Sequence, residues 1–185
     1  MKTRPYFLLF LLFVAPLTFL SSCNKIKELT AVPVTMNLPR QHFTYSPTLL
    51  KSNEVILYAA KITINLDSLL SANGLSSSTI PTATFTNIAV TMERPADSTF
   101  HWLSSMRATV ADNQAFNPEY TVGSVINTNP LAKTVIVTLN DVNIRPYLSQ
   151  TGFYLRIYAV LNGPLPALTV GMFLDGTILL TIQPV

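Results

Sequence analysis

Reactive side chains are scarce in this sequence of 185 residues. It contains one cysteine, Cys23, and two histidines, His42 and His101, and its nine acidic residues are scattered along the chain. The two histidines do not have a spacing that would place two metal ligands on one face of a helix or strand. We therefore predict neither a metal site nor a bound cofactor.

Motifs for catalysis are equally scarce. The sequence contains neither a GxSxG nucleophile elbow nor a glycine-rich phosphate loop. A glycosidase would need two carboxylates flanking a cleft, whereas Glu93 and Asp97 lie around Pro95 in a segment that we expect to be a solvated loop. The sequence favours a non-catalytic protein. A hydrolase whose acids meet only in the folded chain is an alternative.

Three consecutive residues, Phe100, His101 and Trp102, follow that loop and form a candidate binding surface. Exposed aromatic side chains can stack on sugar rings or anchor a protein partner. The alternative is that Trp102 closes one end of the folded domain, beside Leu103 and Met106.

The composition indicates a β-rich globular domain. Charged residues make up 11% of the chain and hydrophobic residues 49%, which excludes a disordered, highly charged tail. The formal charge of +3 comes with no cluster of Lys and Arg, so we do not expect nucleic-acid binding. Thr, Ser and Asn are abundant, and Thr favours half-buried strand surfaces. The length fits one domain after a processed leader.

The N-terminus has the features of a secretory signal peptide. Lys2 and Arg4 precede an apolar run over residues 6–20, which is shorter than the roughly 20 residues that a membrane-spanning helix needs. The run ends in Leu20-Ser21-Ser22-Cys23.

This tetrapeptide resembles the lipobox of bacterial lipoproteins, in which an apolar residue and two small ones precede a cysteine. The resemblance implies diacylglycerol transfer to Cys23, cleavage between Ser22 and Cys23, and membrane anchoring through two or three acyl chains. An ordinary signal peptide beside a buried cysteine is one alternative. An uncleaved membrane anchor is disfavoured by the short run and by Pro16. The expected organisation is a signal peptide over 1–22, a tether over 23–28 and a domain over 29–185.

The same resemblance bears on location and modification. Asn24 occupies the position where Asp favours inner-membrane retention in enterobacterial lipoproteins, so the outer membrane is expected. The chain is similar in style to small β-rich lipoproteins of Bacteroidota. Ser68 and Ser98, each preceded by Asp, resemble O-glycosylation acceptors of that group.

Alternating apolar residues predict strands, and two segments with helical spacing predict short helical crossovers, over 65–73 and 143–150. In the strand over 153–161 both faces are apolar except at Arg156, which predicts a central strand. We expect 168–182 to be one strand, bent at Asp175-Gly176 and paired with 153–161, although a hairpin at that dipeptide is an alternative. The predicted strands cover residues 30–36, 41–45, 54–64, 82–92, 106–111, 133–139, 153–161 and 168–182.

These elements predict an all-β fold, an Ig-like or Greek-key β-sandwich of about seven to nine strands. The function expected is a lipid-anchored binding or assembly module of the cell envelope, held in the membrane by acyl chains on Cys23, with a protein or glycan partner. A structural accessory subunit of an envelope complex and an envelope glycan hydrolase are the alternatives.

Overall fold

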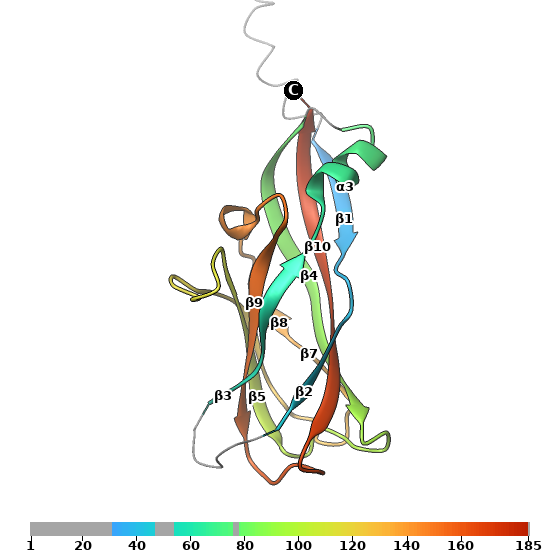
Figure 1. Ribbon diagram of the computed structural model, residues 1–185, viewed down its shortest axis with the longest axis vertical. Helices are drawn as coiled ribbons and strands as arrows, with labels where there is room; N and C mark the ends of the chain where they lie inside the picture. Colours follow the sequence, from blue (N-terminus) through green and yellow to red (C-terminus); the bar gives the residue numbers. More distant parts are fainter. Residues whose placement is uncertain (1–30, 47–53, 76–77, 185) are drawn as a thin grey trace, which may run out of the picture.

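The computed structural model describes residues 31–46, 54–75 and 78–184 (Figure 1). Strands dominate the described chain, with one α-helix and one 3-10 turn. The elements are β1 (Val32–Asn37), β2 (Gln41–Tyr45), β3 (Val55–Thr63), α3 (Leu66–Ala72), β4 (Ser78–Arg94), β5 (Leu103–Ala111), β6 (Tyr120–Ile126), β7 (Thr134–Ile136), β8 (Thr138–Leu139), η1 (Arg145–Tyr147), β9 (Gly152–Leu161) and β10 (Val170–Pro184).

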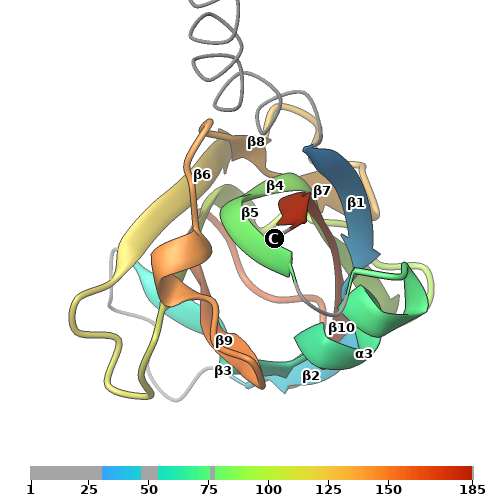
Figure 2. The same cartoon turned by 90° about the horizontal axis from the view of Figure 1, so that it is seen from above.

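The strands form two five-stranded sheets whose paired strands are all antiparallel. Sheet A has the order β1-β10-β4-β7, with β2 also paired to β10, and sheet B has the order β3-β9-β5-β6-β8. In the view down the long axis, β6 and β9 of sheet B lie on one side of the molecule and β1 and β10 of sheet A lie on the other (Figure 2). The predicted all-β sandwich is confirmed, and the described residues form ten strands, where about seven to nine were expected.

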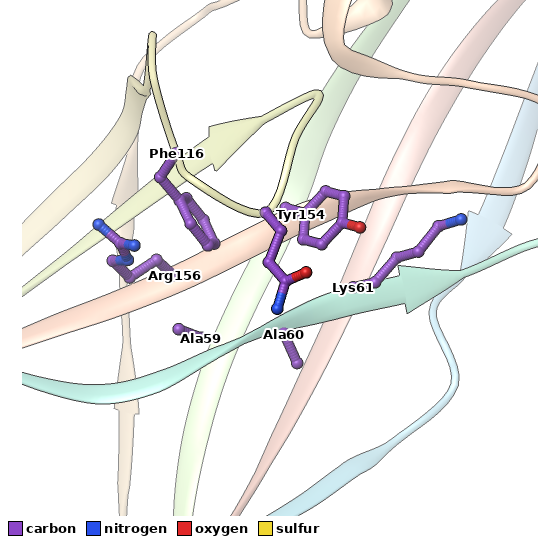
Figure 3. A pocket seen from close by; sticks show the side chains of 7 residues that line it. Ala59, Ala60, Lys61, Phe116, Tyr154 and Arg156 are labelled. Atoms are coloured by element: carbon purple, nitrogen blue, oxygen red, sulfur yellow. The ribbon is translucent and has the colours of Figure 1, made fainter.

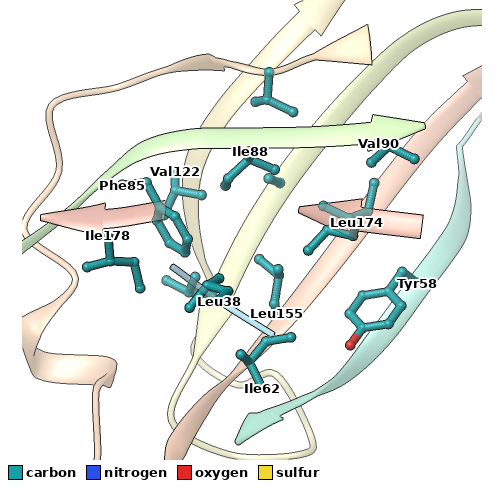
Figure 4. Close-up of a cluster of buried hydrophobic side chains, with 14 of the residues drawn as sticks. Leu38, Tyr58, Ile62, Phe85, Ile88, Val90, Val122, Leu155, Leu174 and Ile178 are labelled. Atoms are coloured by element: carbon teal, nitrogen blue, oxygen red, sulfur yellow. The ribbon is translucent and has the colours of Figure 1, made fainter. Parts of the chain in front are cut away.

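One hydrophobic core lies between the sheets, and alternate residues of each strand supply it. Leu155 and Ile157 of β9 and Leu174 and Ile178 of β10 have no exposed surface. Figure 4 shows Leu155 and Leu174 from the two sheets within one cluster of buried side chains. The opposite faces of these strands therefore remain available for polar and charged groups.

The last strand is a single element, as predicted, but its expected pairing was wrong. β10 pairs with β1, β2 and β4 in sheet A, not with β9 in sheet B. Strands β9 and β10 belong to different sheets, and each turns one buried face toward the shared core. They therefore lie on opposite sides of the core and are not neighbours in one sheet. Asp175 and Gly176 are both paired, and the register shifts just beyond them, between Thr177 and Ile178.

Two further predictions need correction. The strand expected over 133–139 is two short strands, because the chain leaves sheet A after β7 and enters sheet B at β8, with Val137 buried between them. Strand β6 was not predicted, since Gly123 and Ser124 interrupt its apolar residues.

Both helical segments occur where they were predicted. In α3, which joins sheet B to sheet A, Asn65 accepts a hydrogen bond from the Ser68 N–H at 2.9 Å, and Gly74 after the helix has φ +71°. The second is only the η1 turn, and it joins two strands of sheet B. Pro33 lies on the edge strand β1, as expected for a residue that cannot donate to a ladder. Within the described ranges, no helix has the length and apolar character needed to cross a membrane.

Candidate binding site on the outer face of sheet B

Strand β9 presents three polar or aromatic side chains on the face of sheet B away from the core. Tyr154, Arg156 and Tyr158 are half-buried there, while the intervening Leu155 and Ile157 point into the core. This alternation follows from the two-residue repeat of a strand. It places the single charged residue of β9 in the middle of the sheet.

Neighbouring strands bring partners to these side chains. Arg107 of β5 lies opposite Tyr158, and Thr109 lies opposite Arg156. The Arg107 guanidinium carbon is 4.1 Å from the centroid of the Tyr158 ring, which is a cation–π contact. The β5–β9 pairing therefore builds a row of alternating cations and rings.

Glu119, just before β6, organises this row. One of its oxygens accepts a hydrogen bond from Thr109 Oγ1 at 3.1 Å, and Tyr158 OH donates to the carboxylate at 3.0 Å. Arg156 Nη1 donates to Tyr158 OH at 2.8 Å and to Glu119 at 3.4 Å. Thr109 is fully buried, so its hydroxyl needs the partner that Glu119 supplies.

The charges of this network cancel. Arg107 donates to both oxygens of Glu54, from Nε at 3.2 Å and from Nη2 at 2.8 Å. These hydrogen bonds raise the pKa of the Arg107 guanidinium above its ordinary value, because they favour its charged form. Two arginines, Arg107 and Arg156, thus face two glutamates, Glu54 and Glu119.

Phe116 covers Arg156 from the loop between β5 and β6. The Arg156 guanidinium carbon is 3.7 Å from the centroid of the Phe116 ring, and the Tyr154 ring meets that of Phe116 edge-on at 6.0 Å. Phe116 has φ +54°, a region that bulky residues rarely adopt and that costs free energy. Asn113 holds this loop by donating to the Asn117 carbonyl at 3.0 Å.

A pocket of about 500 Å³ opens beside these residues (Figure 3). Ala59 lies opposite Arg156 in the register of β3 and β9, and its small side chain leaves space next to the guanidinium. Lys61 lies opposite Tyr154 in the same register. The residues lining the pocket are Ala59, Ala60, Lys61, Gln114, Phe116, Tyr154 and Arg156.

Two features of the pocket concern its nitrogen atoms. The Arg156 Nε is buried without a hydrogen-bond partner in the described part of the chain. The Lys61 ammonium donates to Thr151 Oγ1 at 2.9 Å and forms no ion pair with any described residue. Lys61 and Arg156 are the charged residues that line the pocket, and Glu119, which pairs with Arg156, lies outside its lining.

A second pocket, of about 430 Å³, lies on the outer face of sheet A and includes His42, Glu93 and Arg94. His42 Nδ1 lies 3.1 Å from Glu93, and both side chains are more than one-third exposed. Nearby, Asp175 accepts two hydrogen bonds from Arg40, which raise the pKa of that guanidinium. Exposed pairs of this kind contribute little to stability, and the sheet B site has the more buried polar network.

The aromatic surface predicted at Phe100, His101 and Trp102 was wrong. Phe100 and Trp102 have no exposed surface and pack together with ring centroids 5.5 Å apart, and only His101 is exposed. The burial of Trp102 agrees with the alternative, in which Trp102 closes one end of the domain. Both side chains lie in the turn just before β5, and their apolar surface is buried in the hydrophobic core.

The other predicted site residues fall into two groups. Ser22 and Cys23 lie outside the described residues. Ser68 is exposed on the first turn of α3, and Ser98 is half-buried in the β4–β5 turn. Within the described ranges, no three His, Cys, Asp or Glu side chains group closely enough to hold a metal ion.

Sequence reasoning did not find the sheet B site. Arg156 was interpreted only as an interruption of an apolar strand. The available signal was an arginine flanked by tyrosines at two-residue spacing, which places all three on one face of a strand.

No model of a known protein family matches this chain, and no curated protein matches it in sequence. Among solved structures, it is similar to one of Desmodium yellow mottle tymovirus, at 13% identity over 83% of this chain and 90% of that chain, with a TM-score of 0.28. A Turnip Yellow Mosaic Virus structure matches at 16% identity over 83% and 96%, with a TM-score of 0.25. A 60-mer BFDV capsid protein matches at 13% over 84% and 95%, with a TM-score of 0.30. Scores this low carry no argument about function.

Proposed function

We propose that this chain is a lipid-anchored, non-catalytic binding module of the bacterial cell envelope. Acyl chains on Cys23 hold it in a membrane, which we expect to be the outer membrane, and the pocket on the outer face of sheet B receives its ligand. The single observation that carries the proposal is the sequence Leu20-Ser21-Ser22-Cys23 directly after a basic and apolar leader.

Two further observations support the proposal. Cys23 is the only cysteine, so no other thiol competes for acylation and no disulfide gives it another role. The first strand begins at Val32, only nine residues after Cys23 in the sequence. A short tether of this kind suits a domain that works close to a membrane surface.

Incorporation of labelled palmitate tests the anchor. Cells expressing the full chain are grown with the label, fractionated, and compared with cells expressing Cys23→Ala. We expect the label in the membrane fraction of the parent protein and a complete loss of label in Cys23→Ala, because the thiol is the acyl acceptor.

Ser22→Ala is the matched control, since alanine is also small and leaves the cysteine in place. It should retain both the label and the membrane location. A Cys23→Ala protein that remains labelled and membrane-bound would refute the anchor.

A further inference from the structure

We propose that Asn162 is a site of spontaneous deamidation in the folded protein, whereas the fold protects Asn73 from the same reaction. The chain contains two Asn-Gly dipeptides, Asn73-Gly74 and Asn162-Gly163. Glycine after asparagine favours deamidation, because it has no side chain to hinder the approach of its backbone nitrogen. The inference goes beyond the proposed function and does not depend on it.

The reaction needs only the chain and water. The Gly163 backbone nitrogen gives its proton to water and attacks Asn162 Cγ. An N–Cγ bond forms, the Cγ–Nδ2 bond breaks, and ammonia leaves after taking up a proton from water, so the product is a cyclic imide. A water molecule then opens the ring at Cγ to give aspartate, or at the Asn162 backbone carbonyl carbon to give isoaspartate. Either product replaces a neutral amide with a carboxylate.

Hydrogen bonds protect Asn73 although its side chain is exposed. Its Nδ2 donates to the Leu69 carbonyl at 2.8 Å, and the Gly74 N–H donates to the Ser71 carbonyl at 3.0 Å. The reaction would break both hydrogen bonds, because Nδ2 leaves and the Gly74 nitrogen is the nucleophile. The end of α3 must therefore open locally before Asn73 can react.

Asn162 is also exposed, but it has neither of these restraints. It follows β9 directly, and its backbone N–H donates to the Trp102 carbonyl at 2.9 Å. Among the described residues, neither the Asn162 side chain nor the Gly163 N–H makes a hydrogen bond. The approach of the Gly163 nitrogen to Cγ therefore breaks no hydrogen bond within the described part of the chain.

The product would change the loop between β9 and β10 and leave β9 paired. A carboxylate at residue 162 would add a negative charge at the start of the loop that carries the exposed Leu168. Isoaspartate would also lengthen the main chain, since the path then runs through Cβ and Cγ. That change lies on the C-terminal side of the hydrogen bond to Trp102, so this bond can persist.

The test is incubation of the full chain in a mild detergent at neutral pH and physiological temperature, followed by peptide mapping with mass spectrometry. Electron-transfer fragmentation distinguishes isoaspartate from aspartate. We expect Asn162 to react at least about tenfold faster than Asn73, because local opening limits the reaction at Asn73. The rate at Asn162 should rise with pH, because the attacking group is the deprotonated amide.

Unfolding the chain in guanidinium chloride separates the effect of structure from that of sequence. Glycine follows each asparagine, so the two sites should react at similar rates once α3 and the end of β9 are lost. In the folded chain, Asn65→Ala removes the side-chain cap of α3 and should speed the reaction at Asn73 about threefold to fivefold. The rate at Asn162 should not change in this variant.

Gly163→Ala tests the nucleophile. A Cβ at this position would lie 3.8 Å from the Trp102 Cα, an ordinary van der Waals contact, so the variant should fold normally. It should slow the reaction at Asn162 about tenfold, because the added methyl group hinders the approach to Cγ.

Four results would overturn the proposal: an unreactive Asn162, equal rates at the two sites in the folded chain, a rate ratio that persists in guanidinium chloride, or an unchanged rate at Asn162 in Gly163→Ala. An unchanged rate at Asn73 in Asn65→Ala would refute its protection by α3. The palmitate experiment does not involve Asn162, so failure of this inference and failure of the envelope anchor are separate results.

Discussion

At the scale of single residues, the outer face of sheet B depends on Glu119. Its carboxylate accepts hydrogen bonds from Thr109, Tyr158 and Arg156, and it lies between two arginine side chains. Without it, the fully buried Thr109 hydroxyl would lose its partner and the two cations would face each other unscreened.

Glu119→Ala should therefore lower the free energy of unfolding by about 2 kcal/mol, the cost of leaving a buried hydroxyl and a partly buried cation unpaired. Urea denaturation monitored by circular dichroism measures this. Glu93→Ala, which removes an exposed carboxylate paired with His42, is the control and should cost less than 1 kcal/mol. Equal effects of the two substitutions would contradict the assigned role of Glu119.

Tyr58 gives the protein a pH dependence at the alkaline end. Burial raises the pKa of its phenol above the usual value of about 10, because the ionised form is poorly solvated in the core. Above pH 10 the unfolded chain loses this proton first, so the unfolded state is favoured and stability falls as pH rises. Below pH 10 both states hold the proton and the effect vanishes.

Tyr58→Phe should reduce the fall in stability between about pH 10 and pH 12. The dependence of stability on pH in the acid range should stay the same as in the parent protein. Thermal melts over this range, compared with the parent protein, provide the measurement. Burial also raises the pKa of Tyr45, so part of the alkaline loss should persist in the variant. An unchanged alkaline slope would show that Tyr58 ionises equally in both states.

The position of a side chain could be predicted from sequence where burial in the core determines it, and less well where contacts on the surface determine it. The strand over 153–161 was predicted from its apolar residues, and Leu155, Ile157 and Ala159 are apolar because they are buried in the core. The burial of Phe100 and Trp102 was only one of two interpretations, since an aromatic residue after a turn can face either way. The meeting of Arg156, Glu119 and Phe116 requires the β5–β6 loop to fold back over β9, and no local pattern specifies that contact.

At the scale of elements, β3 and β9 meet tightly where β9 begins. Gly152 has φ +130°, and a Cβ at this position would overlap the Ile62 carbonyl oxygen. Only glycine combines this backbone conformation with such close approach. The start of β9 therefore fixes the register that later places Ala59 opposite Arg156 and Lys61 opposite Tyr154.

Gly152→Ala should destabilise the protein by about 3 kcal/mol or more, because it adds a backbone clash to a strained φ. Gly74→Ala is the matched control. Gly74 also has positive φ, but its Cβ would meet nothing within 4 Å, so the cost should stay at about 1 kcal/mol. Equal losses in chemical denaturation would show that the contact with Ile62 is unimportant.

Elements were predicted well where they carry their own signal. Helix α3 has leucines at helical spacing, a capping Asn65 and a terminal glycine, and β4, β9 and β10 alternate over many residues. Which sheet each strand joins was not encoded locally. Residues 162–169 are compatible with a return within one sheet, and only the need to bury both β9 and β10 across one core sends the chain to sheet A.

At the scale of the whole molecule, the two sheets share one core, which should unfold cooperatively. Trp102 is the only tryptophan and is fully buried, so its fluorescence reports on the core, while far-ultraviolet circular dichroism reports on the strands. We expect the two signals to give the same urea midpoint. Midpoints that differ beyond error would indicate that one sheet loses structure before the other.

The position of β1 limits how far one end of the domain could lie from the membrane if Cys23 is lipidated. Val32 pairs with Ile182 near the end of β10, at the end of the molecule where α3 lies (Figure 1). Nine residues span at most about 30 Å when fully extended, so an acylated Cys23 would keep this end within that distance of the lipid. The β9–β10 loop with its exposed Leu168 lies at the opposite end, so a partner could reach it without passing between the attachment point and the lipid.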